Sequence, residues 1–311
     1  MNNTAYAGVF FGVLFCMISA AFDVYVANIT QKLNPAVFIV YCFILSSVVF
    51  IVISSRKKGT WNYFLKAKVS FRHLILVNVS VLLNWGGLIL SLKYLEPAVV
   101  GIVSVACGPA LTLVISRYVI KGTSSPTRIE EGIAWIVLVG VIIMLVNSYL
   151  GKSGITSTTN NERFIGIVCV VVSAIGTVLY TFISKKLSKN SWKPYEILGF
   201  RNILMLIIAL VYVVTCKLSF SLSIEMFFIV LALSVIGHIF PVFLIQSSIS
   251  NLDPMHVSLM LLLLPVFTLL FQFIDSRIQV SYESISAVIF ITVLLVVLGI
   301  NKLQNKNGLR K

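Results

Sequence analysis

The sequence contains few charged residues, and very few of them are acidic. Only 11% of the 311 residues are charged and 59% are hydrophobic, and ten Asp and Glu stand against 24 Lys and Arg. A soluble domain has roughly a quarter of its residues charged. This composition excludes a soluble protein, and no polar stretch is long enough to form a separate soluble domain.

The residue patterns of enzymes and cofactor proteins are also missing. The three histidines are scattered, and we find no histidine–acid cluster, metal-ligand spacing, glycine-rich phosphate loop or nucleophile elbow. We therefore expect no enzymatic activity, no cofactor and no metal site, and the chain alone cannot be an ATP-driven pump. The five cysteines all fall in apolar runs, where we expect small buried hydrophobes: Cys16, Cys42, Cys107, Cys169 and Cys216.

What the sequence does contain is a series of apolar runs, many of them near the length of about 20 residues that a spanning helix needs. The first run has no basic region before it and no cleavage pattern after it, so we expect a retained helix. We predict an all-α membrane protein with ten transmembrane helices, at 5–28, 36–55, 73–93, 97–117, 130–150, 163–185, 194–216, 225–249, 255–275 and 284–303.

The basic residues lie mainly in the loops between these spans. Of the 24 Lys and Arg, 17 lie on the side of the N-terminus, six lie on the opposite side, and Arg201 lies within a span. The positive-inside rule then predicts that both termini are cytoplasmic. The net charge of +14 is thus a sign of topology and of contact with the lipid bilayer, not of nucleic-acid binding. Loops rich in Lys, Asn and Ile favour a bacterial inner membrane.

The chain also repeats itself. "YLEP" at 94–97 matches "NLDP" at 251–254, each lying between two spans, and a proline follows inside the next helix in both cases. Further pairs keep the same order: Pro109 with Pro265, Thr112 with Thr268, and Gly12, Ser19 and Ala20 with Gly166, Ser173 and Ala174. We predict two halves of five helices, residues 1–151 and 162–305.

An odd number of helices per half inverts the second half in the membrane. Such inverted repeats allow alternating access in many transporters, although a duplication can also persist in a membrane protein of another function. Glu96 and Asp253 suit helix caps and, secondarily, gates. Pro109 and Pro265 are expected to bend their helices and free a backbone carbonyl each, so they are candidate gating residues.

Two five-helix halves with a proline-bearing fourth and ninth helix resemble the drug/metabolite transporter superfamily in its ten-helix EamA-type branch. Arg201 in "FRNILMLIIAL" is similar to the arginine that members often carry there. The first half has Tyr41–Cys42 at the comparable place, and Asp275 is the nearest match to the acidic residue expected at the end of the ninth helix. The resemblance implies transport of small metabolites, such as amino acids and their derivatives, through a central cavity between the halves.

Ionisable residues within a span are candidates for function. Asp23 can bind a substrate amine or carry a coupling proton, with Ser19 one turn earlier on the same face; alternatively it is hydrated near the interface or paired with Lys32. His238 suits a proton-linked step or a hydrogen bond to a neighbouring helix. Arg201 can reach lipid head groups, neutralise a partner or bind a substrate carboxylate.

Polar residues at helical spacing supply the other candidates. Ser173, Thr177 and Tyr180 form one stripe that faces either the cavity or another helix. Asn84 and Trp85 lie near mid-depth of the third helix, where lining a pocket is plausible. Gly101, Ser104 and Gly108 suit a close-packing face, and Ser104 is also a candidate for the wall of the binding site.

The leading hypothesis is a secondary transporter of small, partly apolar metabolites that works as an exporter. The substrate-binding candidates are Ser19, Asp23, Asn84, Trp85, Ser104, Ser173, Thr177, Tyr180 and His238, and the coupling or gating candidates are Asp23, His238, Pro109 and Pro265. The alternatives are an uptake facilitator or exchanger and a membrane-embedded protein that transports nothing. We expect a small-molecule substrate, and a monomer or homodimer.

Overall fold

The computed structural model describes residues 3–119, 128–155, 157–252, 254–274, 278–279 and 281–308. Within these ranges every regular element is a helix and no strand occurs, which confirms the all-α prediction. The elements are α1 (Asn3–Lys32), α2 (Pro35–Lys58), α3 (Thr60–Val69), α4 (Phe71–Val81), η1 (Leu82–Gly86), α5 (Gly87–Tyr94), α6 (Pro97–Val119), α7 (Arg128–Tyr149), α8 (Asn160–Lys189), α9 (Pro194–Phe200), α10 (Ile203–Thr215), α11 (Ile224–Ala232), η2 (Leu233–Ile239), α12 (Phe240–Asn251), α13 (Pro254–Leu261), α14 (Leu263–Phe271), η3 (Gln272–Ile274) and α15 (Tyr282–Gly308).

Most of these helices are apolar enough to cross a membrane. Seven stretches of the described chain are also long enough: Tyr6–Lys32, Pro35–Lys58, Phe71–Tyr94, Glu131–Tyr149, Asn160–Lys189, Pro194–Thr215 and Ile224–Asn251. Three shorter apolar helices coincide with the fourth, ninth and tenth predicted spans: Pro97–Gly108, Leu263–Ile274 and Tyr282–Leu298. The chain is therefore a multi-pass membrane protein, and the count of ten spans stays a prediction.

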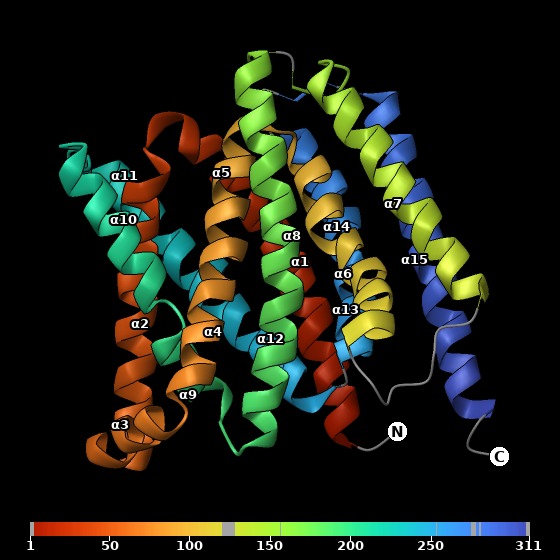
Figure 1. Cartoon of the computed structure of the whole chain (residues 1–311). Helices are drawn as coiled ribbons and strands as arrows, with labels where there is room; N and C mark the ends of the chain where they lie inside the picture. Colours follow the sequence, from red (N-terminus) through yellow and green to blue (C-terminus); the bar gives the residue numbers. More distant parts are fainter. Residues whose placement is uncertain are drawn as a thin grey trace.

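The first five predicted spans are interleaved with the last five. α1 packs on α12 and α14, whereas α8 packs on α4, α5 and α6 (Figure 1). Towards the edges α2 packs on α9 and α10, and α7 packs on α15. Each of these contacts joins the two predicted halves, so any cavity at the centre is bounded by both.

The two ends of the bundle differ in what they carry. α1 begins and α15 ends at the same end, which also holds α3 with its Lys66 and Lys68 (Figure 1). The opposite end holds the links from α5 to α6 and from α7 to α8. This arrangement agrees with the predicted placement of both termini on one side; that this side is cytoplasmic stays a prediction.

Two spans change helix type in their middle. Leu82–Gly86 (η1) and Leu233–Ile239 (η2) form π-helical turns between α-helical segments. After η2, Pro241 has no N–H to donate to the Gly237 carbonyl, which favours a wider turn there. Such turns often occur at functional sites, and here η1 carries Asn84 and Trp85 while η2 carries His238.

The two prolines predicted to bend helices behave differently. The helix is interrupted at Leu262, between α13 and α14. Pro265 lacks the N–H that the Leu261 carbonyl would accept. α6, by contrast, runs through Pro109 as a continuous α-helix.

Glu96 does not cap its own helix. The first turn of α6 is capped from elsewhere, because the Ala98 N–H donates to Gln272 Oε1 over 3.2 Å. The buried carboxylate of Glu96 instead accepts hydrogen bonds from the Gly154 N–H and the Ser284 hydroxyl, both at 2.8 Å, and from Gln272 Nε2 at 2.9 Å. Glu96 thus ties α6 to the second half. Asp253, its counterpart in the repeat, lies outside the described residues.

Replacing Glu96 by alanine is expected to destabilise the fold, because three buried donors lose their acceptor. We expect a loss of about 3 kcal/mol, the order of magnitude for leaving buried polar groups unsatisfied, and a melting temperature several degrees lower in detergent. Glu283→Ala is the matched control, since Glu283 is exposed at the start of α15. Equal melting temperatures for the two variants would contradict this role of Glu96.

Candidate functional site

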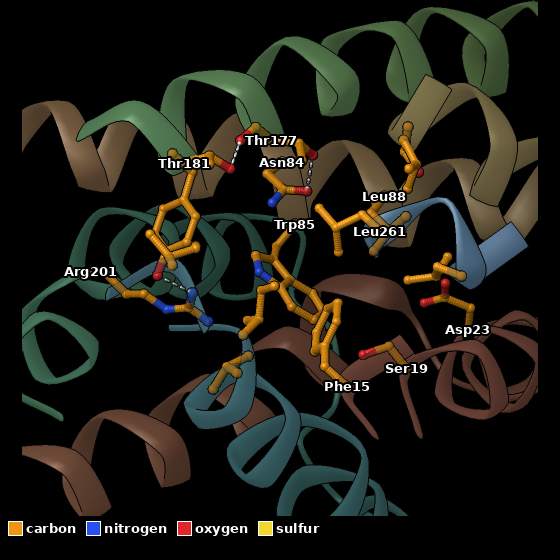
Figure 2. A pocket seen from close by; sticks show the side chains of 17 residues that line it. Phe15, Ser19, Asp23, Asn84, Trp85, Leu88, Thr177, Thr181, Arg201 and Leu261 are labelled. Carbon is orange, nitrogen blue, oxygen red and sulfur yellow. Dashed lines mark hydrogen bonds between the residues drawn. The ribbon is translucent and has the colours of Figure 1, made fainter. Parts of the chain in front are cut away.

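A cavity of about 80 Å³ lies at the centre of the bundle, where α1, α8 and the bent spans meet (Figure 2). Both predicted halves contribute to its wall. The first half contributes Phe15, Ser19 and Asp23 of α1, Asn84 and Trp85 of η1, Leu88 of α5, and Ser104 and Val105 of α6. The second half contributes Thr177, Tyr180 and Thr181 of α8, Arg201 between α9 and α10, Val242, Ile245 and Ile249 of α12, Leu261 of α13 and Leu264 of α14. Seven of the nine residues proposed from the sequence as substrate-binding are among them.

The predicted polar stripe of α8 meets the third span at Asn84. Thr177 Oγ1 donates to Asn84 Oδ1 over 3.1 Å (Figure 2). Ser173 Oγ lies 3.4 Å from the same oxygen. The two alternatives for the stripe therefore hold together, because it joins two helices and also faces the cavity. Ser173 lies behind Asn84, outside the lining, whereas Thr177 and Tyr180 are part of the wall.

Ser104 combines two roles in the same way. Its hydroxyl donates to the Gly101 carbonyl over 3.1 Å, and its side chain lines the cavity. Gly101 packs closely on α14, since a Cβ added there would lie 3.5 Å from Leu264 and Thr268 side-chain atoms. This is an ordinary contact distance, so the turn has room for a small side chain. A Cβ at Gly108 would meet nothing within 4 Å, so the predicted close-packing face does not extend to that residue.

Asp23 lies in the wall of the cavity and is only 3% exposed. It makes no hydrogen bond or ion pair with any residue that the structure describes, so the suggested pairing with Lys32 is absent. Ser19, one turn earlier, also lines the cavity, and its buried hydroxyl has no partner in the described part of the chain. A carboxylate held in this way is available to bind a cation or a proton.

Arg201 faces the cavity and does not reach out to lipid head groups. It lies in the break between α9 and α10, is 1% exposed, and donates from Nη1 to the Tyr180 hydroxyl over 2.8 Å (Figure 2). The Tyr180 hydroxyl in turn donates to Gln246 Oε1 of α12. Within the described residues Arg201 Nε and Nη2 have no partner. We did not predict a role for Gln246 from the sequence, although a polar amide inside an apolar span could have indicated one.

Residues 164–301 match the EamA-like transporter family. The match covers a little under half of the chain and places that part in the drug/metabolite transporter superfamily. A crystal structure of another protein shares the fold of this transporter with a TM-score of 0.64, at 13% sequence identity over 97% of this chain and 99% of the other. No curated protein matches the transporter in sequence.

This match indicates that the chain is a membrane transporter of small molecules. It agrees with the central cavity and with the contribution of both parts of the chain to its wall. No group of three metal-ligating residues occurs among the described residues of the transporter. All five cysteines are free; three are buried, whereas Cys169 is half-buried and Cys216 is exposed, contrary to the expectation that all are buried.

His238 lies behind the cavity wall of the transporter. Its ring is fully buried, and its centroid lies 4.6 Å from that of Trp85 and 4.4 Å from that of Phe43. Neither ring nitrogen has a hydrogen-bond partner among the described residues, so the suggested bond to a neighbouring helix is absent. Trp85 thus separates His238 from the cavity, and the imidazole supports the indole from behind.

A second carboxylate ties the two parts of the transporter together at the other end of the bundle. Glu196 of α9 pairs with Lys58 of α2 at 3.0 Å and with Lys66 of α3 at 2.5 Å. Its side chain is fully buried, so this contact is more than a surface ion pair. This cluster could not be predicted from the sequence, since its three residues lie in three different helices.

Proposed function

We propose that this chain is a secondary transporter that exports small, partly apolar metabolites, such as amino acids or related amphipathic compounds, by alternating access. It crosses the inner membrane ten times, with both termini in the cytoplasm, as two inverted halves at 1–151 and 162–305. The observation that carries this proposal is the central cavity, which is walled by both halves. Among the described residues, Asp23 in its wall has no ion-pair partner and Arg201 has two nitrogens without a hydrogen-bond partner.

The pattern of helix contacts supports the inverted repeat. If α8 in the second half corresponds to α1 in the first, each packs on the third and fourth spans of the opposite half. The second spans of the halves pack on each other, as do the fifth. The π-helical turns η1 and η2 fall in the third and eighth spans, which correspond as well. A pseudo-twofold axis through the cavity accounts for all of these relations.

The lining suggests a role for each residue. Trp85 and Tyr180 pack against the apolar part of the cargo, while Asn84 and Thr177 orient its polar groups; Ser173 fixes the amide of Asn84. Ser19 and Ser104 add hydroxyl groups to the wall. Asp23 binds a cationic group of the cargo or carries a coupling proton.

Two carboxylate ties keep the cavity closed at its ends. Glu96 holds the end where α5 passes to α6, and Glu196 holds the end that contains α3. Opening to one side requires the tie on that side to break, while the other stays closed. Pro109 lies in the span that follows the link from α5 to α6, and Pro265 lies in the span that follows α12, so both are candidate hinges for such movements.

The test is transport by purified protein in liposomes. We expect radiolabelled amino acids to exchange across the membrane, and net movement to respond to an imposed proton gradient. Loading from each side separates export from uptake. Absence of exchange for amino acids, polyamines and nucleosides, with the protein folded in the liposomes, would overturn the proposal.

His238 is proposed to act through Trp85 as a positioning residue. His238→Ala removes the ring behind the indole and is expected to slow exchange about tenfold, the effect of a small displacement in a binding site. His238→Phe keeps a ring of similar size and is expected to restore exchange. If the phenylalanine variant fails like the alanine variant while both fold, titration of the imidazole carries the role instead.

A further inference from the structure

The guanidinium group of Arg201 is held with one of its edges unused. Nη1, on one side, donates to the Tyr180 hydroxyl over 2.8 Å. Nε and Nη2, which share the adjacent edge of the planar group, have no partner among the described residues. Arg201 is among the residues that line the central cavity (Figure 2), so these two parallel N–H groups form a vacant two-pronged donor that is buried at its wall.

The charge of Arg201 is likewise uncompensated. Within the described chain no carboxylate forms an ion pair with it. Glu196, the acid nearest to Arg201 in the sequence, pairs with two lysines instead. Asp23, the acid in the same cavity, forms no ion pair with any described residue. A buried charge without a counter-charge is costly and is retained where a ligand supplies the missing group.

We propose that Arg201 binds the carboxylate group of the cargo in a bidentate, side-on arrangement; this rests on the proposed function of the cavity. A carboxylate offers two coplanar oxygens that match the Nε and Nη2 edge. Both N–H groups are closed off in the present conformation, so the carboxylate reaches them as the halves move apart.

Tyr180 and Gln246 position the guanidinium for this task. Tyr180 accepts from Arg201 and donates to Gln246, so a chain of hydrogen bonds crosses from α8 to α12. The Tyr180 ring also lies under the guanidinium, with 5.1 Å between its centroid and Arg201 Cζ. These contacts fix the plane of the group and leave the Nε and Nη2 edge free for a ligand.

The surroundings favour a carboxylate attached to an apolar body over a phosphate. One guanidinium edge can pair with a carboxylate or with a phosphate, but a phosphate dianion carries a second negative charge, and among the described residues no other Lys or Arg lines the cavity to balance it. The remaining wall near Arg201 is largely aliphatic, with Val242, Ile245 and Ile249 on α12. The inferred cargo is therefore a small carboxylate with an apolar substituent.

The test compares ligand-induced melting shifts of the purified full chain in detergent. The probes are alanine, valine, leucine and phenylalanine, each beside its methyl ester, and inorganic phosphate. We expect at least one free amino acid to raise the melting temperature of the wild type, and its ester, which lacks the anionic group, to have little effect.

Variants of Arg201 test whether its guanidinium group is the carboxylate site. Arg201→Met keeps the length and removes the uncompensated charge, so we expect the ligand-free melting temperature to stay level or rise while the carboxylate-induced shift disappears. Arg201→Lys keeps the charge but not the fork, and should bind the amino acid at least about tenfold more weakly.

Four outcomes overturn the proposal. The first two are the absence of a shift with every free amino acid and equal shifts with acid and ester. The other two are a methionine variant that keeps the carboxylate shift and a larger shift with phosphate than with any amino acid. Because melting shifts need no transport, failure of exchange in liposomes with an intact carboxylate shift would count against the proposed function alone.

Discussion

Asp23→Asn is expected to reduce exchange by about a hundredfold, equivalent to about 2.7 kcal/mol, without loss of folded protein. The substitution keeps the shape of the side chain and removes its ability to carry a charge or release a proton. Asp23 has no partner in the described residues that would be lost, and a neutral amide avoids burying a charge. The melting temperature should therefore stay level or rise.

Exchange by Asp23→Asn should be measured in liposomes beside Glu225→Gln. Glu225 is an exposed acid at the start of α11, far along the chain from any lining residue, and its neutralisation should leave exchange unchanged. Equal exchange rates for wild type, Asp23→Asn and Glu225→Gln would remove Asp23 from the site. If exchange persists in Asp23→Asn but no longer responds to a proton gradient, Asp23 carries the coupling proton alone.

Gly176→Val is expected to abolish folding. α8 crosses η1 at this residue so closely that a Cβ at Gly176 would lie 2.4 Å from the Asn84 backbone nitrogen and 2.8 Å from its Cα. Backbone atoms cannot move aside as a flexible side chain can, so α8 would have to separate from the third span. We expect a loss of more than about 3 kcal/mol and little monodisperse protein.

The matched control for Gly176→Val is Gly132→Val on α7. Gly132 is exposed and a Cβ there meets nothing within 4 Å. Size-exclusion profiles and yields of the two variants should differ sharply. A folded Gly176→Val protein with the melting temperature of the wild type would show that α8 and η1 do not pack as described, and would displace Asn84 and Thr177 from the proposed site.

The sequence predicted the helices and much of the cavity wall, for identifiable physical reasons. The bilayer demands long apolar runs, and period 3.6 places Ser173, Thr177 and Tyr180 on one face whatever lies opposite. A polar stripe within lipid has to meet another helix or a cavity, and the structure places Asn84 opposite it. Because lipid excludes a polar face, the stripe on α8 predicts that another helix or a cavity lies against it.

What could not be predicted depends on neighbours that are distant in the sequence. Arg201 turns inward because Tyr180 lies within reach, and His238 is shielded because Trp85 covers it. Glu96 has the sequence of a helix cap, yet its partners come from the second half of the chain. A periodic pattern assigns a residue to a face and cannot identify which helix covers that face.

The most direct test of the account is the accessibility of the cavity from each side of the membrane. Ser104 lines the cavity from α6, so Ser104→Cys in a background without the five native cysteines provides one reporter. In sealed vesicles of either orientation, a small impermeant thiol reagent is predicted to label this cysteine from both sides, and bound cargo is predicted to slow labelling. Labelling from one side only, or from neither while exchange continues, would contradict a shared cavity that opens alternately to the two sides.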